Sequence, residues 1–340
     1  MTHLYCIYGL HLESQTEIEG LSPALPSKSL LNSDRIEISV GAPPNWVEAA
    51  LRLPAEIIYF SRMTSTPGEP AFELAKLGES NFFRFAYADG TRFVLDTQTQ
   101  RIWGSSPPPL TQEDLFTYLA GPVLGFVLRE RGILALHASS FSNGGFAFAL
   151  CGGQGAGKST AAAALAIRGV SILCEDITAL REKAGIFCAS PGYPRVNLWP
   201  ESATNLFGSR MALPRITPNW EKRFLALDGG AGKFANSERQ LAGVYILEER
   251  SDDGVPRIEE VPARDATMLL VQNTYMNYLL GKEQRAEEFA ALARLASRVR
   301  ICKLISPRDP AKIGAMCGLL ESDSANLAAN LSASPESQRS

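Results

Sequence analysis

The sequence predicts an α/β protein in which a phosphate-binding loop (P-loop) core follows a β-rich N-terminal domain. Residues 146–168 read as an apolar strand that runs into a glycine loop and then an alanine-rich helix. Residues 170–174 form a second apolar run that ends in two acids. Residues 1–104 alternate short apolar runs with turn signals, a pattern typical of strands joined by turns.

The glycine loop matches the phosphate-binding pattern G-x-x-x-x-G-K-[ST]. A triphosphate can approach main-chain N–H groups only where side chains are absent, and glycines remove them. Lys158 would bring a cation to the β and γ phosphates, and Ser159 a hydroxyl to Mg²⁺, at the positive end of the helix from Ser159 to Arg168. We therefore expect ATP and Mg²⁺ as cofactors, held by Gly152, Gly153, Gln154, Gly155, Ala156, Gly157, Lys158, Ser159 and Thr160.

Composition argues against several other classes of protein. A chain of 340 residues with 45% hydrophobic content can hold two domains, and a net charge of −3 gives no electrostatic footprint for nucleic acid. The six cysteines form no C-x-x-C pair, and three histidines are too few for a histidine-based zinc site. The longest apolar run, residues 118–128, is too short to cross a bilayer. We expect a cytoplasmic protein without nucleic-acid or membrane partners.

Three segments are expected along the chain. Residues 1–106 are predicted to be a β-rich accessory domain with a hairpin turn at Ala88-Asp89-Gly90. The alternative role of this domain is to bind an extended strand of a partner. Residues 107–320 are predicted to be the catalytic domain, which begins with a proline-kinked helix over residues 112–131. Residues 321–340 are rich in Ser, Ala, Asn and Gln and are expected to be a disordered tail.

Acidic residues follow the strand after the P-loop helix, at Glu175 and Asp176. Carboxylates at a strand end beside a phosphate loop are where such proteins hold Mg²⁺ or a catalytic base, and a solvated acidic turn is the alternative. Neighbours on an extended chain point to opposite faces, so only one acid should face the site unless the strand breaks there. Hairpin counting places His137 near Cys151, at the mouth of the loop, where it is either functional or a hydrogen-bonded core residue.

Four motifs in this order resemble the kinase domain of the HPr kinase/phosphorylase family: Leu-His-Ala-Ser at 136–139, the loop at 152–160, Cys-Glu-Asp-Ile-Thr-Ala-Leu at 174–180, and Pro-Gly-Tyr-Pro-Arg-Val-Asn-Leu-Trp at 191–199. The likeness covers about residues 112–320 and is greatest to the branch found with lasso-peptide and other modified-peptide pathways. It implies a serine kinase whose core is of the HPr kinase/phosphoenolpyruvate carboxykinase type.

The resemblance also implies roles for the acids. Asp176 would be the general base, Glu175 its neighbour at the metal or the hydroxyl, and His137 an orienting partner. Ser159, Glu175 and Asp176 would then surround the metal. The family's E-V-R-G-x-G signature is replaced here by Gly192-Tyr-Pro-Arg-Val-Asn, without its glutamate and later glycine. The resemblance therefore does not extend to HPr as the substrate, to the phosphorylase direction or to the family's hexamer, and a homo-oligomer stays open.

Basic and aromatic residues downstream complete the expected site. Arg195 is expected to stabilise charge on the transferred phosphoryl group. Lys222 and Arg223 lie in a segment rich in turn formers, and a loop there is expected to bring a cationic side chain to the reacting phosphate. The alternative is a basic pair on the surface that is only solvated. Tyr193 and Trp199 are either core aromatics or pack beside nucleotide or peptide.

The predicted function is an ATP-dependent serine kinase that acts on a peptide or protein, with a ribosomal peptide precursor among the candidate acceptors. The alternatives are a small-molecule kinase, acting on free serine or another alcohol, and a non-catalytic ATP-binding regulator. The sequence has neither the N-K-x-D motif that selects guanine nor the L-S-G-G-Q signature of a transporter ATPase. ATP is therefore favoured over GTP.

Overall fold

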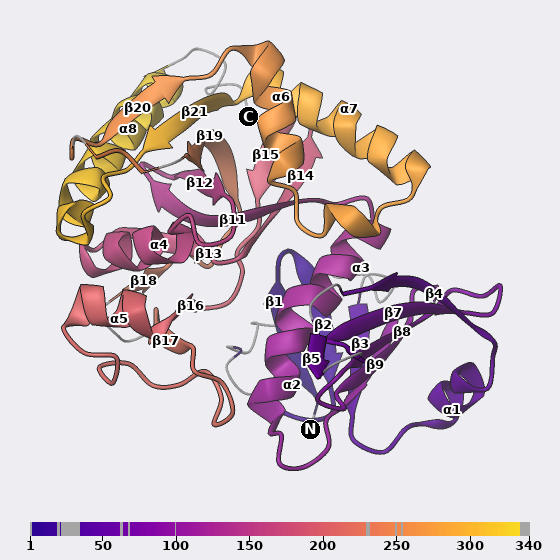
Figure 1. Cartoon of the computed structure of the whole chain (residues 1–340). Coiled ribbons are helices and arrows are strands. Elements are labelled where there is room, and N and C mark those ends of the chain that lie inside the picture. Colours follow the sequence, from indigo (N-terminus) through magenta and orange to yellow (C-terminus); the bar gives the residue numbers. More distant parts are fainter. Residues whose placement is uncertain are drawn as a thin grey trace. The chain divides into compact units, whose positions relative to one another are not determined.

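The structure is a computed structural model in which the chain divides into two compact units (Figure 1). The first unit takes in Met1–Arg131 and Thr217–Trp220, and the second takes in Gly132–Ile216 and Glu221–Ser340. The structure describes residues 2–18, 21, 35–61, 64–66, 69–98, 100–228, 232–248, 250–252 and 254–333. No helix within these ranges is long and apolar enough to cross a membrane.

A mixed sheet forms the first unit, and eight strands of its described residues pair in the order β1-β2-β3-β10-β9-β8-β7-β4. The turn predicted at Asp89 joins β8 to β9, where Gly90 has a φ of 90° and the Thr91 N–H donates to Asp89 Oδ1 at 2.9 Å. The strands are β1 (His3–Ile7), β2 (Leu10–Ser14), β3 (Arg35–Val40), β4 (Ala55–Phe60), β7 (Phe72–Leu77), β8 (Phe82–Tyr87), β9 (Arg92–Asp96) and β10 (Arg101–Ser105). A separate pair, β5 (Thr64–Thr66) with β6 (Glu69–Pro70), and helix α1 (Asn45–Leu51) complete the strand-rich part.

The helix predicted over residues 112–131 is present in three parts, and its kink is a π-helical turn that contains Pro122. Phe126 packs edge-on against Phe83 and Phe85 of β8, with ring centroids 4.9 and 5.4 Å apart. Because the helix buries its apolar face on the first sheet, it belongs to the first unit. The second unit therefore begins at Gly132, later than the predicted start of the catalytic domain at residue 107. The parts are α2 (Gln112–Tyr118), η2 (Leu119–Val123) and α3 (Leu124–Glu130).

A second sheet organises the second unit. Within the described residues, pairing runs in a closed circuit from β11 through β14, β15, β19 and β12 back to β11. The strands are β11 (Leu134–Asn143), β12 (Phe146–Gly152), β13 (Ser171–Cys174), β14 (Ile177–Lys183), β15 (Ile186–Ala189), β18 (Lys233–Phe234), β19 (Arg239–Leu247), β20 (Arg257–Glu260) and β21 (Arg300–Ile305). A two-stranded sheet of β16 (Arg195–Leu198) and β17 (Arg223–Ala226) stands apart from this path.

Helices cover both faces of the second sheet, as Figure 1 shows. Phe148 and Leu150 of β12 join the core with α4 and α8, whereas the alternate residues Ala149 and Cys151 join the core with α6 and α7. This alternation follows from the two-residue repeat of a strand. The helices are α4 (Lys158–Ile167), α5 (Pro200–Phe207), α6 (Ala263–Gln272), η3 (Asn277–Leu279), α7 (Lys282–Arg298), η4 (Pro310–Lys312) and α8 (Ile313–Ala333).

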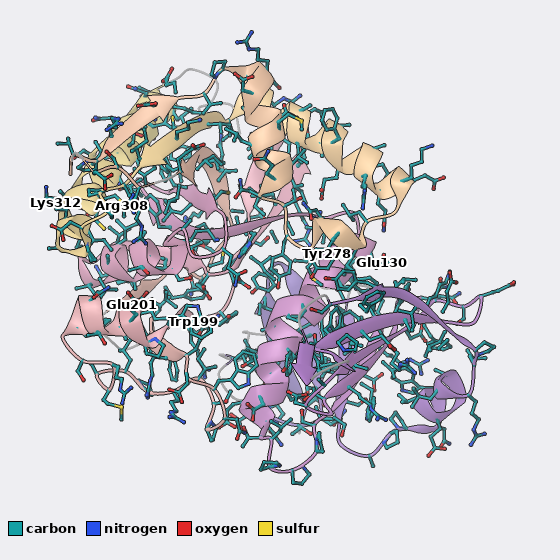
Figure 2. The ribbon with its side chains drawn as sticks, in the orientation of Figure 1. Glu130, Trp199, Glu201, Tyr278, Arg308 and Lys312 are labelled. Carbon is teal, nitrogen blue, oxygen red and sulfur yellow. The ribbon has the colours of Figure 1, made fainter. Side chains whose placement is uncertain are left out.

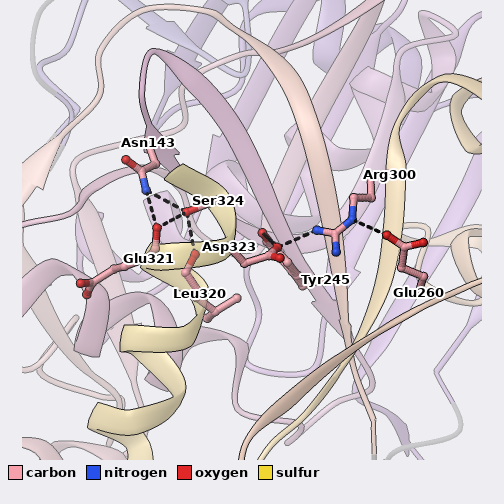
Figure 3. A network of polar contacts seen from close by, with 8 residues as sticks. All are labelled: Asn143, Tyr245, Glu260, Arg300, Leu320, Glu321, Asp323 and Ser324. Carbon is pink, nitrogen blue, oxygen red and sulfur yellow. Dashed lines mark hydrogen bonds and ion pairs between the residues drawn. The ribbon is translucent and has the colours of Figure 1, made fainter. Parts of the chain in front are cut away.

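The predicted disordered tail is wrong as far as Ala333, because α8 continues through it, and residues 334–340 lie outside the described residues. Asp323 of α8 accepts hydrogen bonds from Tyr245 Oη at 2.7 Å and from Arg300 Nη1 at 2.6 Å (Figure 3). At the next residue of α8, Ser324 Oγ accepts a hydrogen bond from Asn143 Nδ2 at 2.8 Å. A polar composition suggested disorder, but these contacts with strands of the second sheet hold the helix in place.

Candidate functional site

The glycine loop lies between β12 and α4 and has a conformation that depends on two of its glycines. Gly152 has a φ of 151°, and a Cβ there would come within 3.0 Å of the Leu247 carbonyl oxygen. Gly157 has a φ of 102° and is the N-cap residue of α4. Residues with side chains rarely adopt either φ value, and a side chain at Gly152 would also collide with Leu247 of β19. Because glycine has no side chain, the main-chain N–H groups at these positions are not covered by one.

Lys158 is folded onto the loop that precedes it. Its ammonium group donates to the carbonyl oxygens of Gly152 at 2.8 Å and Gly153 at 3.1 Å. The residue is 7% exposed, and this burial lowers the pKa of Lys158 even though the nearby charges of Asp176 and Glu175 act to raise it. A largely desolvated cation therefore sits at the start of α4, close to two carboxylates.

A tight turn separates β13 from β14 and carries both acids. The Ile177 N–H donates to the Glu175 carbonyl oxygen at 2.8 Å, and Asp176 has a φ of 66°, which together form a γ-turn. Such a conformation is strained for a non-glycine residue. The strand thus breaks at the acids, which is the condition under which both were expected to reach one site.

Glu175 is enclosed, with only 5% of the residue exposed. Its Oε1 atom accepts a hydrogen bond from Ser159 Oγ at 2.7 Å, and its Oε2 atom accepts one from Asn197 Nδ2 at 3.2 Å. Burial and the neighbouring charge of Asp176 raise the pKa of Glu175 to about 7, against the opposing effects of Ser159 and of the Lys222 charge. Both carboxylate oxygens are therefore fixed, one by α4 and the other by β16.

Asp176 reaches solvent, with 40% of its side chain exposed. His137 lies on β11, and its Nε2 atom is 3.2 Å from Asp176 Oδ1. Enclosure by protein acts to raise the pKa of Asp176, but the hydrogen bond and charge of His137 and the charges of Lys222 and Lys158 bring the pKa below its ordinary value. The pair of acids is thus divided into an ionised, accessible carboxylate and a buried one that holds its proton more tightly.

The register of β11 agrees closely with the position predicted for His137. Ala138 pairs with Cys151, so His137 lies one position further toward the loop. Its main-chain N–H donates to the Asn273 carbonyl oxygen at 2.7 Å, and its ring meets that of Tyr275 edge-on at 5.9 Å between centroids. These contacts fix the imidazole that faces Asp176.

The three predicted cations have different surroundings. Lys222 Nζ lies 4.9 Å from the ring centroid of Trp199, and its charge lowers the pKa of both acids. Trp199 itself is 59% exposed at the N-terminus of α5 (Figure 2). The Arg195 guanidinium lies 4.4 Å from the ring centroid of Phe224. Of these three cations, Lys222 is therefore the one that acts on both acids.

Arg223 does not occupy the position expected of a catalytic cation. It is 5% exposed, and its guanidinium nitrogens lie 3.5 Å from the Leu213 carbonyl oxygen and 3.5 Å from Met211 Sδ. Successive residues entering β17 point to opposite sides, so the direction that brings Lys222 toward the acids turns Arg223 toward residues 211–213. The contacts of Arg223 are therefore with the segment 211–213 and not with the two acids.

Aromatic and polar residues of β16 and its approach also reach the acids. Tyr193 is 8% exposed, and burial together with the charges of Glu175 and Asp176 raises its pKa well above the ordinary value. Its hydroxyl accepts a hydrogen bond from Asn197 Nδ2 at 2.9 Å. Tyr193 is thus a buried aromatic residue whose hydroxyl is linked to Glu175 through Asn197.

Two further polar residues near the site were not predicted from the sequence. Asn197 bridges Tyr193 and Glu175, and its only sequence signal is its place in the segment that replaces the E-V-R-G-x-G signature. Arg250 follows β19, and a Cβ on Gly157 would lie 3.8 Å from its Nη2 atom. The local sequence around Arg250 is rich in charge and gives no signal that distinguishes this arginine.

Comparison with solved structures finds chains that resemble this one. No protein-family model and no curated protein matches the chain. A solved structure described as the "Hpr(Ser) kinase/phosphatase from Coxiella burnetii" aligns with 60% of this chain and 96% of its own, at 13% sequence identity and a TM-score of 0.28. At that TM-score the likeness carries no argument about function, which rests on the site described above.

Proposed function

We propose that the protein is a kinase that transfers the γ-phosphoryl group of ATP to a serine hydroxyl of a peptide or protein. The observation that supports this most directly is the γ-turn at Asp176, which presents an ionised carboxylate beside the glycine loop. In this proposal the loop binds the phosphates through its main-chain N–H groups and the N-terminus of α4. Lys158 would leave the loop carbonyls for the phosphates, which are stronger acceptors.

The side chains beside the loop suit Mg²⁺. Ser159 Oγ and the Glu175 carboxylate are oxygen donors already in contact at 2.7 Å, and Mg²⁺ prefers oxygen ligands. No cluster of three His, Cys, Asp or Glu that could hold a metal exists within the described residues. Mg²⁺ is commonly held by one or two carboxylates together with substrate phosphates, and Glu175 would be such a carboxylate here. When bound, Mg²⁺ would offset the charge on those phosphates.

The remaining residues have roles in the proton and charge balance of the transfer. Asp176 accepts the proton of the serine hydroxyl as its oxygen attacks the γ-phosphorus and the bond to the β-phosphate oxygen breaks. His137 donates a hydrogen bond to Asp176 Oδ1 and so leaves Oδ2 to face the hydroxyl. Lys222 and Arg195 would offset charge on the transferred group.

Transfer from γ-labelled ATP in the presence of Mg²⁺ tests this proposal. Serine-containing peptides should gain the mass of one phosphate, and Asp176→Asn should abolish the transfer while ATP still binds. Transfer to free serine alone would instead identify a small-molecule kinase. ATP binding without transfer to any alcohol would identify a regulator and contradict the proposal.

A further inference from the structure

Asn197 has an unusual hydrogen-bonding environment inside the site. Its Nδ2 atom donates to two acceptors, Glu175 Oε2 at 3.2 Å and Tyr193 Oη at 2.9 Å. Its Oδ1 atom is buried and has no hydrogen-bond partner among the residues that the structure describes. One half of the amide is thus fully used, and the other half has no donor.

The orientation of the amide follows from the chemistry of its neighbours. A carboxylate that binds a divalent cation is ionised and can only accept hydrogen bonds, so in the metal-bound protein the NH₂ group faces Glu175 and the carbonyl oxygen is the other branch of the amide. Rotating the amide by 180° would bring Oδ1 against Glu175 Oε2, and two acceptors would then repel each other. The position of Oδ1 is therefore set by Glu175.

A buried carbonyl oxygen without a donor destabilises the folded state, and such atoms in folded proteins call for an explanation such as a bound ion. Glu175 and Ser159 form the oxygen-donor pair to which Asn197 is attached through Glu175. An amide oxygen is a ligand that hard divalent cations accept.

We infer that Asn197 belongs to the divalent-cation site of this protein, holding the Glu175 carboxylate through Nδ2 and giving Oδ1 to the ion. The inference rests on the proposed function for the presence of the ion, and it adds a residue of β16 to the oxygen ligands from α4 and from the turn after β13. Asn197 lies in the segment that replaces the E-V-R-G-x-G signature.

Mn²⁺ binding, measured by electron paramagnetic resonance with a non-hydrolysable ATP analogue present, tests the inference without any turnover. Asn197→Leu removes both halves of the amide at similar volume and should weaken Mn²⁺ binding by about 10- to 100-fold. Asn197→Asp restores an oxygen but not the NH₂ group, and it should retain most of the wild-type affinity. Asn197→Ala replaces the leucine variant in the comparison if that variant does not fold.

A matched control is Asn143→Leu, because Asn143 also donates through Nδ2 to two acceptors, but on α8. It should lower stability and leave Mn²⁺ affinity unchanged. Wild-type affinity in Asn197→Leu, or no Mn²⁺ binding by the wild-type protein, would overturn the inference. Asn197→Asp binding as weakly as Asn197→Leu would overturn the assignment of Oδ1 as a ligand.

The two proposals can fail separately. If no alcohol is phosphorylated but Mn²⁺ affinity follows the expected order, the kinase assignment fails and the cation site stands. If peptides are phosphorylated and Asn197→Leu binds Mn²⁺ as the wild type does, only the role of Asn197 fails.

Discussion

The Nε2 atom of His137 lies 3.2 Å from Oδ1 of Asp176, and this contact joins strand β11 to the γ-turn that carries the acids. The contact both orients the carboxylate and favours its ionised form. Without it, Asp176 can rotate, and its pKa should rise.

His137→Asn should therefore lower kcat by about 10- to 100-fold through misplacement of the base, with little change in the KM for ATP. The acidic limb of the pH profile of kcat should move to higher pH, because the carboxylate needs less acid to become protonated. Steady-state kinetics across pH measure both effects. His3→Asn, on β1 of the first unit, is the control and should match the wild type. An unchanged pH profile in His137→Asn would show that the histidine has only a packing role.

Lys158→Ala should weaken ATP binding by about 10- to 100-fold, the loss expected for charged hydrogen bonds to a phosphate. Isothermal titration calorimetry with ATP and Mg²⁺ measures the change. Lys183→Ala is a suitable comparison, since this lysine is 58% exposed and pairs with Glu238 away from the loop. Equal affinities in Lys158→Ala and the wild type would argue against nucleotide at the glycine loop.

The glycine loop could be predicted from the sequence because its conformation depends on its own residues. The directions of the Asp176 and Arg223 side chains depend on packing with distant parts of the chain, and the sequence does not show them. Gly152 and Gly157 match a motif because the loop itself needs their conformations. A positive φ is usually predicted from a glycine, but Asp176 adopts one without being a glycine. The sequence therefore left open whether both acids face the same side. The sequence could not show which way the Arg223 side chain points, because this direction depends on where β17 begins.

The extent of each unit depended on tertiary contacts in the same way. The helix that ends at Glu130 looked like the start of the catalytic domain, but Phe126 buries its ring against the first sheet. The polar composition after Glu321 suggested disorder because it does not reveal hydrogen-bond partners such as Tyr245, which lies far away in the sequence.

Glu175 should make the stability of the metal-free protein depend on pH. Its pKa is about 7 in the folded protein against an ordinary value of 4.5, so between these two values the folded state binds more protons than the unfolded state. The free energy of unfolding should therefore fall as pH rises from about 4.5 to about 7, by about 1–3 kcal/mol from this group.

Glu175→Gln isolates this effect because glutamine does not ionise. Urea unfolding without divalent cations should show the variant gaining stability relative to the wild type between pH 5 and pH 8. Glu201→Gln, on the surface helix α5, provides the comparison for a carboxylate outside the buried site (Figure 2). A constant difference between Glu175→Gln and the wild type at both pH values would contradict a raised pKa.

Asp323→Ala should destabilise the second unit through α8, because two hydrogen-bond donors lose a shared acceptor. Tyr245 is 1% exposed, so its hydroxyl would be left buried without Asp323, and Arg300 would lose a charged partner at 2.6 Å. We expect a loss of about 2–3 kcal/mol in the free energy of unfolding, since the pair with Arg300 is only partly buried. Asp252→Ala breaks an exposed pair with Arg308 and should change stability by less than about 0.5 kcal/mol. Chemical denaturation of the two variants compares them directly, and equal stabilities would mean that α8 is not held to the sheet by Asp323.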